Sequence, residues 1–213
     1  MRFTVRFAGL VLLLASATGC WVARSLPDQV APAPPVPTGE MRRTFYAGER
    51  LLRSETRVLV YPDGRVEKHG VEREYYRDGK LKSERHHDHD EPAGVWKDWY
   101  EGEVLRSEVD FGDGETPAPM RFWYPSGQLE AEGLGIGGVK HGEWTFYSED
   151  GKVSHAGCFE GAKRVGTWSF FDENGQLREQ GDYAEGQRTG EWKFWDAEGD
   201  PSPNATRRAV EQR

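Results

Sequence analysis

Hydrophobic and polar residues alternate in short runs along most of this chain, and the runs recur at a fixed interval. The order glycine, any residue, tryptophan, any residue, phenylalanine and a second aromatic residue occurs at residues 142–147, 166–171 and 190–195. The tryptophans of these runs recur at every 24th position and are Trp144, Trp168 and Trp192. Met120 and Gly127 continue the same spacing toward the N-terminus. The chain therefore contains an internal repeat.

Each repeat predicts two β-strands joined by a tight turn. Trp144 and Phe146 have one parity, whereas Thr145 and Tyr147 have the other, so the two sets face opposite sides of a strand. The run is followed by the polar turn 148–151, whose final glycine supplies the positive φ angle that a hairpin needs. A second alternating run follows as the return strand. Because every link is short, neighbouring strands are antiparallel and form a meander.

The pattern predicts an all-β fold in which successive hairpins form one elongated antiparallel sheet. Burying one tryptophan contributes roughly 5 kcal/mol at about 25 cal/mol/Å² before entropy is subtracted, so a few rings per repeat can hold the sheet together. The expected repeat core and turn glycines are Trp144, Trp168, Trp192, Phe146, Phe170, Phe194, Gly151, Gly175 and Gly199. The turns at 61–64 and 76–79 follow one another more closely than the later turns do, which predicts shortened first hairpins and five to six hairpins in all.

A second aromatic column has the opposite parity to the tryptophans of the core. Its members recur at the same interval as those tryptophans and are Trp99, Trp123, Tyr147, Phe171 and Trp195. These rings should form a row with steps of about 9.6 Å, which is two strand spacings. If that face is open, the row suits stacking on sugar rings or gripping an extended partner. If the sheet curls or the N-terminal hairpins cover it, the row is a second core.

The combined pattern of Gly-x-Trp-x-Phe-aromatic, Asp/Asn-Gly, Leu/Val and aromatic-x-x-Gly resembles the MORN repeat. The similarity is to the bacterial variant often found in proteins labelled putative antitoxins, and it covers roughly residues 44–199. This resemblance implies an elongated sheet of hairpins that serves as a scaffold or binding surface. It carries over no catalytic residue.

The N-terminus has the layout of a secretory signal peptide, with a short basic region, an apolar stretch at 7–15 and small residues before Cys20. The ending Ala17-Thr18-Gly19-Cys20 resembles the bacterial lipobox, which implies lipidation of Cys20 and stable membrane attachment. Ordinary signal cleavage, with Cys20 an incidental thiol, is the alternative. The expected organisation is a signal peptide at 1–19, a lipidated cysteine and proline-rich linker at 20–43, a repeat domain at 44–199 and a tail at 200–213.

The charge distribution argues against nucleic acid as a partner. Removing residues 1–19 takes away Arg2 and Arg6 and moves the net charge from −8 to −10, and an acidic secreted protein is a poor nucleic-acid binder. The turns of one long edge, Asp63 and Asp78 among them, predict an acidic rim. A basic rim is predicted on the opposite edge of the last repeats by Lys140-His141, Lys163-Arg164 and Arg188. Solvated turns are charged in most proteins, so the rims alone identify no partner.

The sequence offers few candidate metal-binding or catalytic residues. The segment His86-His87-Asp88-His89-Asp90-Glu91 is a weak candidate for divalent metal binding through His86, His87 and His89, although a solvent-exposed polar loop is the favoured interpretation. Cys158 has no intramolecular partner once Cys20 is lipidated, and no histidine and carboxylate recur around it as in a nucleophilic site. We expect no catalytic residue, no cofactor and no resident metal.

These patterns favour a non-catalytic, lipid-anchored interaction or scaffold module in the bacterial cell envelope. It would face the periplasm or the cell surface, and Trp21 after Cys20 favours the outer membrane over the inner one. Its partner would be a protein or an envelope polymer bound through the sheet. The alternative is an envelope immunity or antitoxin-type protein that neutralises one specific toxin.

Overall fold

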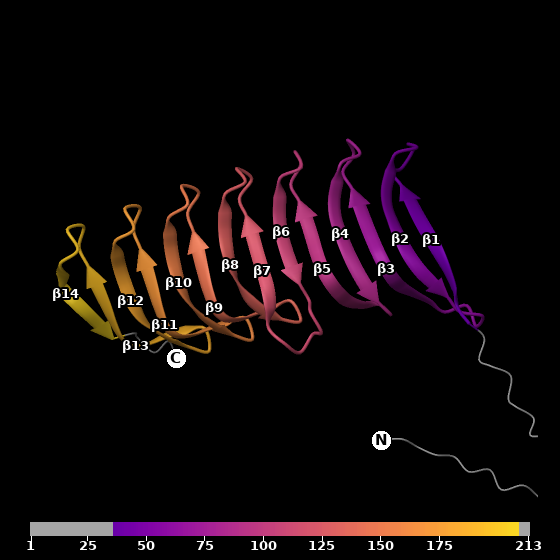
Figure 1. Ribbon diagram of the computed structural model, residues 1–213. Helices are drawn as coiled ribbons and strands as arrows, with labels where there is room; N and C mark the ends of the chain where they lie inside the picture. Colours follow the sequence, from indigo (N-terminus) through magenta and orange to yellow (C-terminus); the bar gives the residue numbers. More distant parts are fainter. Residues whose placement is uncertain (1–35, 209–213) are drawn as a thin grey trace, which may run out of the picture. The chain divides into compact units, whose positions relative to one another are not determined.

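The computed structural model describes residues 36–208, so the predicted signal peptide, Cys20 and most of the proline-rich segment lie outside the described residues. Within that range, fourteen strands form one antiparallel sheet whose spatial order follows the sequence (Figure 1). The strands are β1 (Thr38–Phe45), β2 (Leu52–Val60), β3 (Val66–Tyr75), β4 (Leu81–Asp88), β5 (Glu91–Trp99), β6 (Leu105–Asp110), β7 (Ala118–Trp123), β8 (Leu129–Ile136), β9 (Val139–Tyr147), β10 (Val153–Glu160), β11 (Lys163–Phe171), β12 (Leu177–Ala184), β13 (Gln187–Trp195) and β14 (Pro201–Arg208). The predicted all-β meander of hairpins is confirmed.

The sheet extends beyond the predicted repeat domain at both ends. Strand β1 begins at Thr38, inside the predicted linker, and β14 lies in the predicted tail. The fourteen described strands make seven hairpins at two strands each, which is more than the five to six hairpins expected.

The prediction of shortened first hairpins is wrong. Strands β2 and β3 have nine and ten residues. The turns at 61–64 and 76–79 are consecutive turns at opposite ends of β3 rather than equivalent turns of two hairpins. The full period continues through this region, because Gly70 and Tyr75 stand one repeat before Gly94 and Trp99.

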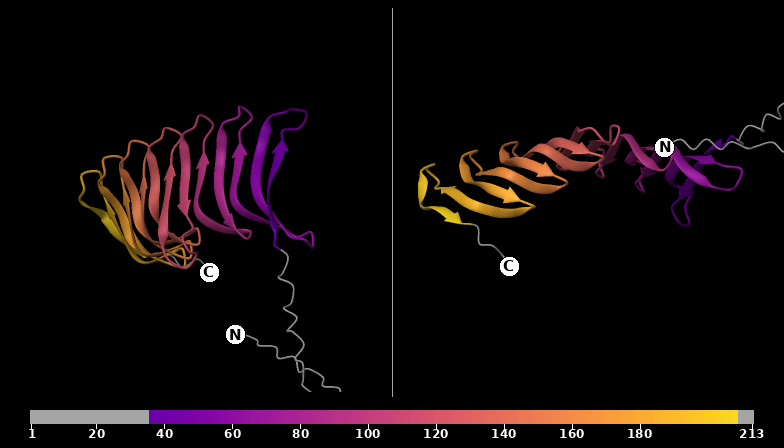
Figure 2. Two further views of the ribbon diagram at one scale, coloured as in Figure 1. Left: turned by 45° about the vertical axis from the view of Figure 1, so that its right-hand side comes forward. Right: turned by 90° about the horizontal axis from the view of Figure 1, so that it is seen from below.

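The outgoing strand of a repeat is the one that ends at the aromatic column. The outgoing strands β3, β5, β9, β11 and β13 each carry an irregularity in their pairing with the preceding strand. In the pairing of β10 with β11, Ala156 lies opposite Ser169 and Cys158 lies opposite Val165, so β11 holds extra residues where β10 has Gly157. Gly166, within this bulge, has a φ of 62°, a region that glycine enters without steric cost. Bulges of this kind bend a strand and increase its twist, and the hairpins rotate progressively along the sheet (Figure 2).

The core is a row of tryptophan rings, each placed over a glycine of the preceding strand. Trp144, Trp168 and Trp192 are 1%, 0% and 2% exposed. A Cβ added at Gly157 would lie 2.3 Å from Cδ2 of Trp168, so the ring position excludes any side chain there. The Trp168 indole Nε1 donates to the carbonyl of Cys158 at 3.2 Å, and Phe159 packs edge-on at 5.1 Å.

Both faces of the sheet lack a covering layer within residues 36–208. All strands belong to the one sheet, and this part of the chain has no helix. It accordingly offers no helix of the length and apolarity that crossing a membrane requires. The core rings are therefore buried by side chains of neighbouring strands on their own face.

Candidate binding surfaces of the sheet

The aromatic column lies on the face opposite to Trp144. The Tyr147 hydroxyl donates to Glu132 Oε1 at 3.0 Å, and Glu132 pairs with Thr145, which faces away from Trp144. Every member ends an outgoing strand and pairs with the first residue of the return strand, as Trp123 does with Leu129. All five rings, those of Trp99, Trp123, Tyr147, Phe171 and Trp195, are partly exposed. The column is thus neither a second buried core nor fully free.

The structure adds residues to this column that sequence reasoning missed. Tyr75 continues it one period before Trp99, and the repeat spacing would have found it. In several repeats a tyrosine directly follows the last residue of the outgoing strand, as Tyr46 follows Phe45 at the end of β1, and its hydroxyl donates to the backbone carbonyl of the column residue in the next repeat. These hydrogen bonds join Tyr46 to Tyr75 (2.7 Å), Tyr76 to Trp99 (2.6 Å), Tyr100 to Trp123 (2.9 Å) and Tyr124 to Tyr147 (2.8 Å). Neighbouring hairpins are thereby tied together beside the column.

A row of alternating charges crosses strands β1–β8 beside the column. Its members pair in register from strand to strand and are Arg43, Glu55, Arg73, Glu84, Lys97, Glu108, Arg121 and Glu132. Arg73 Nε lies 2.7 Å from Glu84 Oε2, and Lys97 Nζ lies 3.0 Å from Glu108 Oε2. A hydrogen bond from the Tyr75 hydroxyl, helped by Arg43, holds the pKa of Glu55 below its usual range. Because the charges neutralise one another, this face presents rings beside a balanced row rather than a charged patch.

The opposite face, which we call the tryptophan face, carries cations over the core rings in its C-terminal half. Lys140 Nζ lies 4.4 Å from the centroid of the Trp144 ring, and the guanidinium of Arg164 lies 4.4 Å from that of Trp168. Arg188 is 3.9 Å from the Trp192 ring. The predicted basic rim is therefore wrong for these residues, because long side chains cover apolar surface and gain cation–π attraction by folding over the sheet. Burial lowers the pKa of Lys140.

Histidine 155 sits among these rings. The His155 imidazole stacks on Phe146 at 4.3 Å and on Phe170 at 5.7 Å. Burial lowers the pKa of His155 to about 4, and the nearby cations Arg164 and Lys140 add to this effect. The imidazole is consequently neutral at physiological pH and acts as one more flat ring of the stack.

The acidic rim also differs from prediction. Asp63 lies in the turn between β2 and β3, whereas Asp78 lies in the turn between β3 and β4. Consecutive turns of a meander lie at opposite edges, so these two aspartates belong to different edges.

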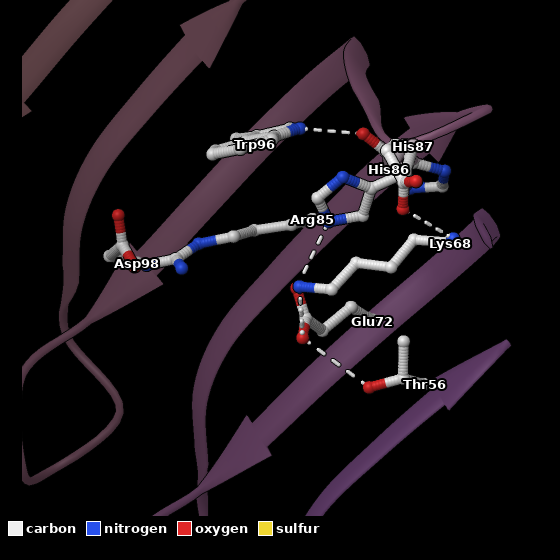
Figure 3. A network of polar contacts seen from close by, with 9 residues as sticks. Thr56, Lys68, Glu72, Arg85, His86, His87, Trp96 and Asp98 are labelled. Carbon is white, nitrogen blue, oxygen red and sulfur yellow. Dashed lines mark hydrogen bonds and ion pairs between the residues drawn. The ribbon is translucent and has the colours of Figure 1, made fainter. Parts of the chain in front are cut away.

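Around β3 and β4 the tryptophan face carries polar side chains at positions where later repeats have aromatic rings. Glu72 occupies the position that Trp96 holds one period later. It accepts hydrogen bonds from Thr56 Oγ1 at 3.3 Å, from Lys68 Nζ at 2.9 Å and from His87 Nε2 at 3.0 Å (Figure 3). Desolvation alone would raise the pKa of Glu72, but the bonds from Lys68 and His87 outweigh it and hold the pKa below its usual range. Lys68 occupies the repeat position that Lys140 occupies three repeats later. The lysine at this position pairs with the Glu72 carboxylate in the earlier repeat and with the Trp144 ring in the later one.

The predicted histidine set is not brought together. His86 and His87 lie on β4, and only His89 is in the turn, so the expectation of a polar loop is wrong. His87 is 8% exposed and faces Glu72, whereas His86 Nε2 lies 4.0 Å from Glu84. His89 Nδ1 lies 2.7 Å from Glu67 Oε2, at a different place on the sheet. The loop expectation failed because His89 and Asp90 close a two-residue turn with φ angles of 49° and 69°.

Cys158 is a free cysteine on β10 and is partly exposed. Its backbone carbonyl, rather than its thiol, takes part in the repeat by accepting the Trp168 hydrogen bond.

Comparison with known proteins agrees with this repeat geometry. Three segments of the chain match the family model described as the MORN repeat variant, namely residues 68–89, 140–160 and 164–185. They coincide with the hairpins β3–β4, β9–β10 and β11–β12. No curated protein matches the chain. The all-β repeat fold is typical of non-catalytic modules used for binding or as scaffolds.

Proposed function

We propose that this protein is a non-catalytic binding module, attached to the bacterial cell envelope by a lipid on Cys20 and facing the periplasm or the cell surface. Its partner is a protein or an envelope polymer that lies along the aromatic column. One observation carries the proposal: a single-layer sheet repeats a partly exposed aromatic residue once per repeat on the face opposite to its core.

The surroundings of the column support a role in binding. A one-sided sheet needs buried rings on one face only, and the tryptophan row already supplies them. Rings such as Trp123 and Tyr147 add a second row at steps of about 9.6 Å. The neighbouring charges are paired, so recognition would depend on ring stacking and shape more than on net charge.

Binding is tested by a pull-down from crosslinked envelopes, followed by affinity measurements with the recovered partner. Trp123→Ala or Tyr147→Ala should weaken binding by about thirtyfold, the effect of a hot spot worth about 2 kcal/mol. Val139→Ala, which removes an exposed apolar side chain near the other edge, is the matched control. Circular dichroism should show that all three variants remain folded.

Wild-type affinity in both column variants would overturn the assignment of the binding face. Recovery of one toxin, inactivated by the module at equal stoichiometry, would instead support the antitoxin-type alternative.

Attachment is tested separately. Cys20→Ser should move the protein from the membrane fraction to the soluble envelope fraction, because a thioether-linked lipid would no longer form. Unchanged membrane fractionation of this variant would contradict the lipoprotein assignment without affecting the binding test.

A further inference from the structure

Two histidines and an aspartate meet where β3 approaches the turn between β4 and β5. His69 lies on β3, Asp88 ends β4 and His89 opens the turn. One nitrogen or oxygen atom from each side chain lies within 4.8 Å of the other two. His69 is absent from the histidine-rich segment and joins the group only through strand pairing.

The separations approach those of ligands around one small cation. Bonds of about 2.0–2.1 Å in a tetrahedral site place neighbouring ligand atoms about 3.3 Å apart. Here His69 Nδ1 lies 3.1 Å from Asp88 Oδ1, and His89 Nε2 lies 3.8 Å from the same oxygen. All three side chains are substantially exposed, so small rotations suffice to bring the atoms to a common centre.

The Glu67 carboxylate contacts the nitrogen of His89 that faces away from Asp88, and it orients the imidazole as outer carboxylates do in metal sites. His89 Nδ1 lies 2.7 Å from Glu67 Oε2, and the Tyr61 hydroxyl donates to the same oxygen at 2.8 Å. A carboxylate that accepts the Nδ1–H fixes the tautomer whose free lone pair is on Nε2, the atom directed toward Asp88. Metal-ligating histidines almost always have such an outer partner.

His69 supplies a second observation. Its Nδ1 atom is buried and has no hydrogen-bond partner of acceptable geometry, although it lies close to Asp88. The two imidazole rings are 4.8 Å apart between centroids. A single cation placed between the rings would contact both nitrogens and the carboxylate at once.

We propose that His69 Nδ1, Asp88 Oδ1 and His89 Nε2 bind one divalent cation of the zinc class, with Glu67 as a positioning residue. Imidazole and carboxylate ligands suit zinc and its neighbours in the first transition row. Water completes the coordination, because three protein ligands leave a position open to solvent. The bound ion clips β3 to the β4–β5 turn, and this role does not depend on the partner of the aromatic column.

Isothermal titration with zinc chloride tests the site on the full chain, purified without a polyhistidine tag. We expect one ion per chain, and His69→Ala and His89→Ala should each weaken the affinity by about tenfold or more. Glu67→Gln should weaken it by about 10- to 100-fold while leaving all three ligands in place. His86→Ala is the matched control, because His86 lies on β4 with the ligand Asp88 but contacts none of the three ligands. This variant should bind zinc as the wild type does.

Thermal unfolding supplies a second readout. Zinc should raise the midpoint of the wild type and of His86→Ala, since a ligand that binds only the folded state stabilises it, and should raise that of His69→Ala by less at the same zinc concentration. Equal affinity in His69→Ala and the wild type would overturn the proposal. Loss of binding in His86→Ala alone would do the same, because it would place the ion elsewhere on β4.

Discussion

Replacing Gly157 by alanine should destabilise the sheet because the new methyl group would meet the Trp168 ring. The added Cβ would lie 2.3 Å from Cδ2 of Trp168, and the ring has little room to move because it is 0% exposed and bounded by Phe159 and Arg164. Overpacking of this kind costs about 1–3 kcal/mol. Without the clash, alanine would be favoured over glycine in a strand by roughly 0.5–1 kcal/mol. We therefore expect a net loss of about 1 kcal/mol.

A double-mutant cycle isolates the contact. Trp168→Ala alone should cost about 3–5 kcal/mol, as for other buried aromatic truncations. In that background Gly157→Ala should be neutral or slightly stabilising, because the ring that it would strike is gone. The coupling free energy should then be about 2 kcal/mol, well above the 0.3–0.5 kcal/mol scatter of roughly independent sites.

The cycle is measured by urea unfolding followed by far-ultraviolet circular dichroism, with the m value checked in every variant. Gly39→Ala is the matched control, because a Cβ at Gly39 meets no atom within 4 Å. Additive effects of Gly157→Ala and Trp168→Ala would refute the inference that Gly157 is required by the ring above it.

Three further predictions concern other parts of the sheet. Trp168→Phe should cost about 1 kcal/mol more than Trp192→Phe in urea unfolding, because of these two indoles only that of Trp168 has a hydrogen-bond partner for Nε1; equal costs would contradict this. Tyr100→Phe should cost about 1 kcal/mol and speed amide exchange around Trp123, whose carbonyl accepts the Tyr100 hydroxyl at 2.9 Å, and unchanged exchange would mean that the bond does not tie the hairpins. The folded pKa of His155 is about 4, below the usual value of 6.5, so the unfolded chain binds more protons between these pH values and stability should fall as pH falls from 6.5 to 4. His155→Phe should reduce that loss, and an identical pH profile in this variant would show that His155 does not cause it.

The repeats from Gly142 onward could be predicted from the sequence because their key residues are intact. Trp144, Trp168 and Trp192 recur with turn glycines, so parity alone separates the two faces. In the repeats closer to the N-terminus, other residues replace some of the tryptophans, and the 24-residue period is harder to see in the sequence. Glu72 stands at a tryptophan position, and a glutamate there does not indicate a core site until its partners are known.

Other features depend on information that one strand does not contain. His69 and His89 come together through the pairing of β3 with β4, and that register could not be fixed from short polar runs. Lys140 was expected at a solvated edge, but its length allows the ammonium to reach back over Trp144. Side-chain reach and cross-strand register thus account for most of the differences.

The match between the repeat length and a pair of strands has an evolutionary consequence. One repeat unit contains an outgoing and a return strand, and its neighbours in space are also its neighbours in sequence. Duplicating or deleting a whole unit in the gene therefore leaves the direction and the facing of every downstream strand unchanged. Each such event would lengthen or shorten the aromatic column by one step of about 9.6 Å. A lineage could in this way fit the sheet to partners of different lengths without redesigning its core.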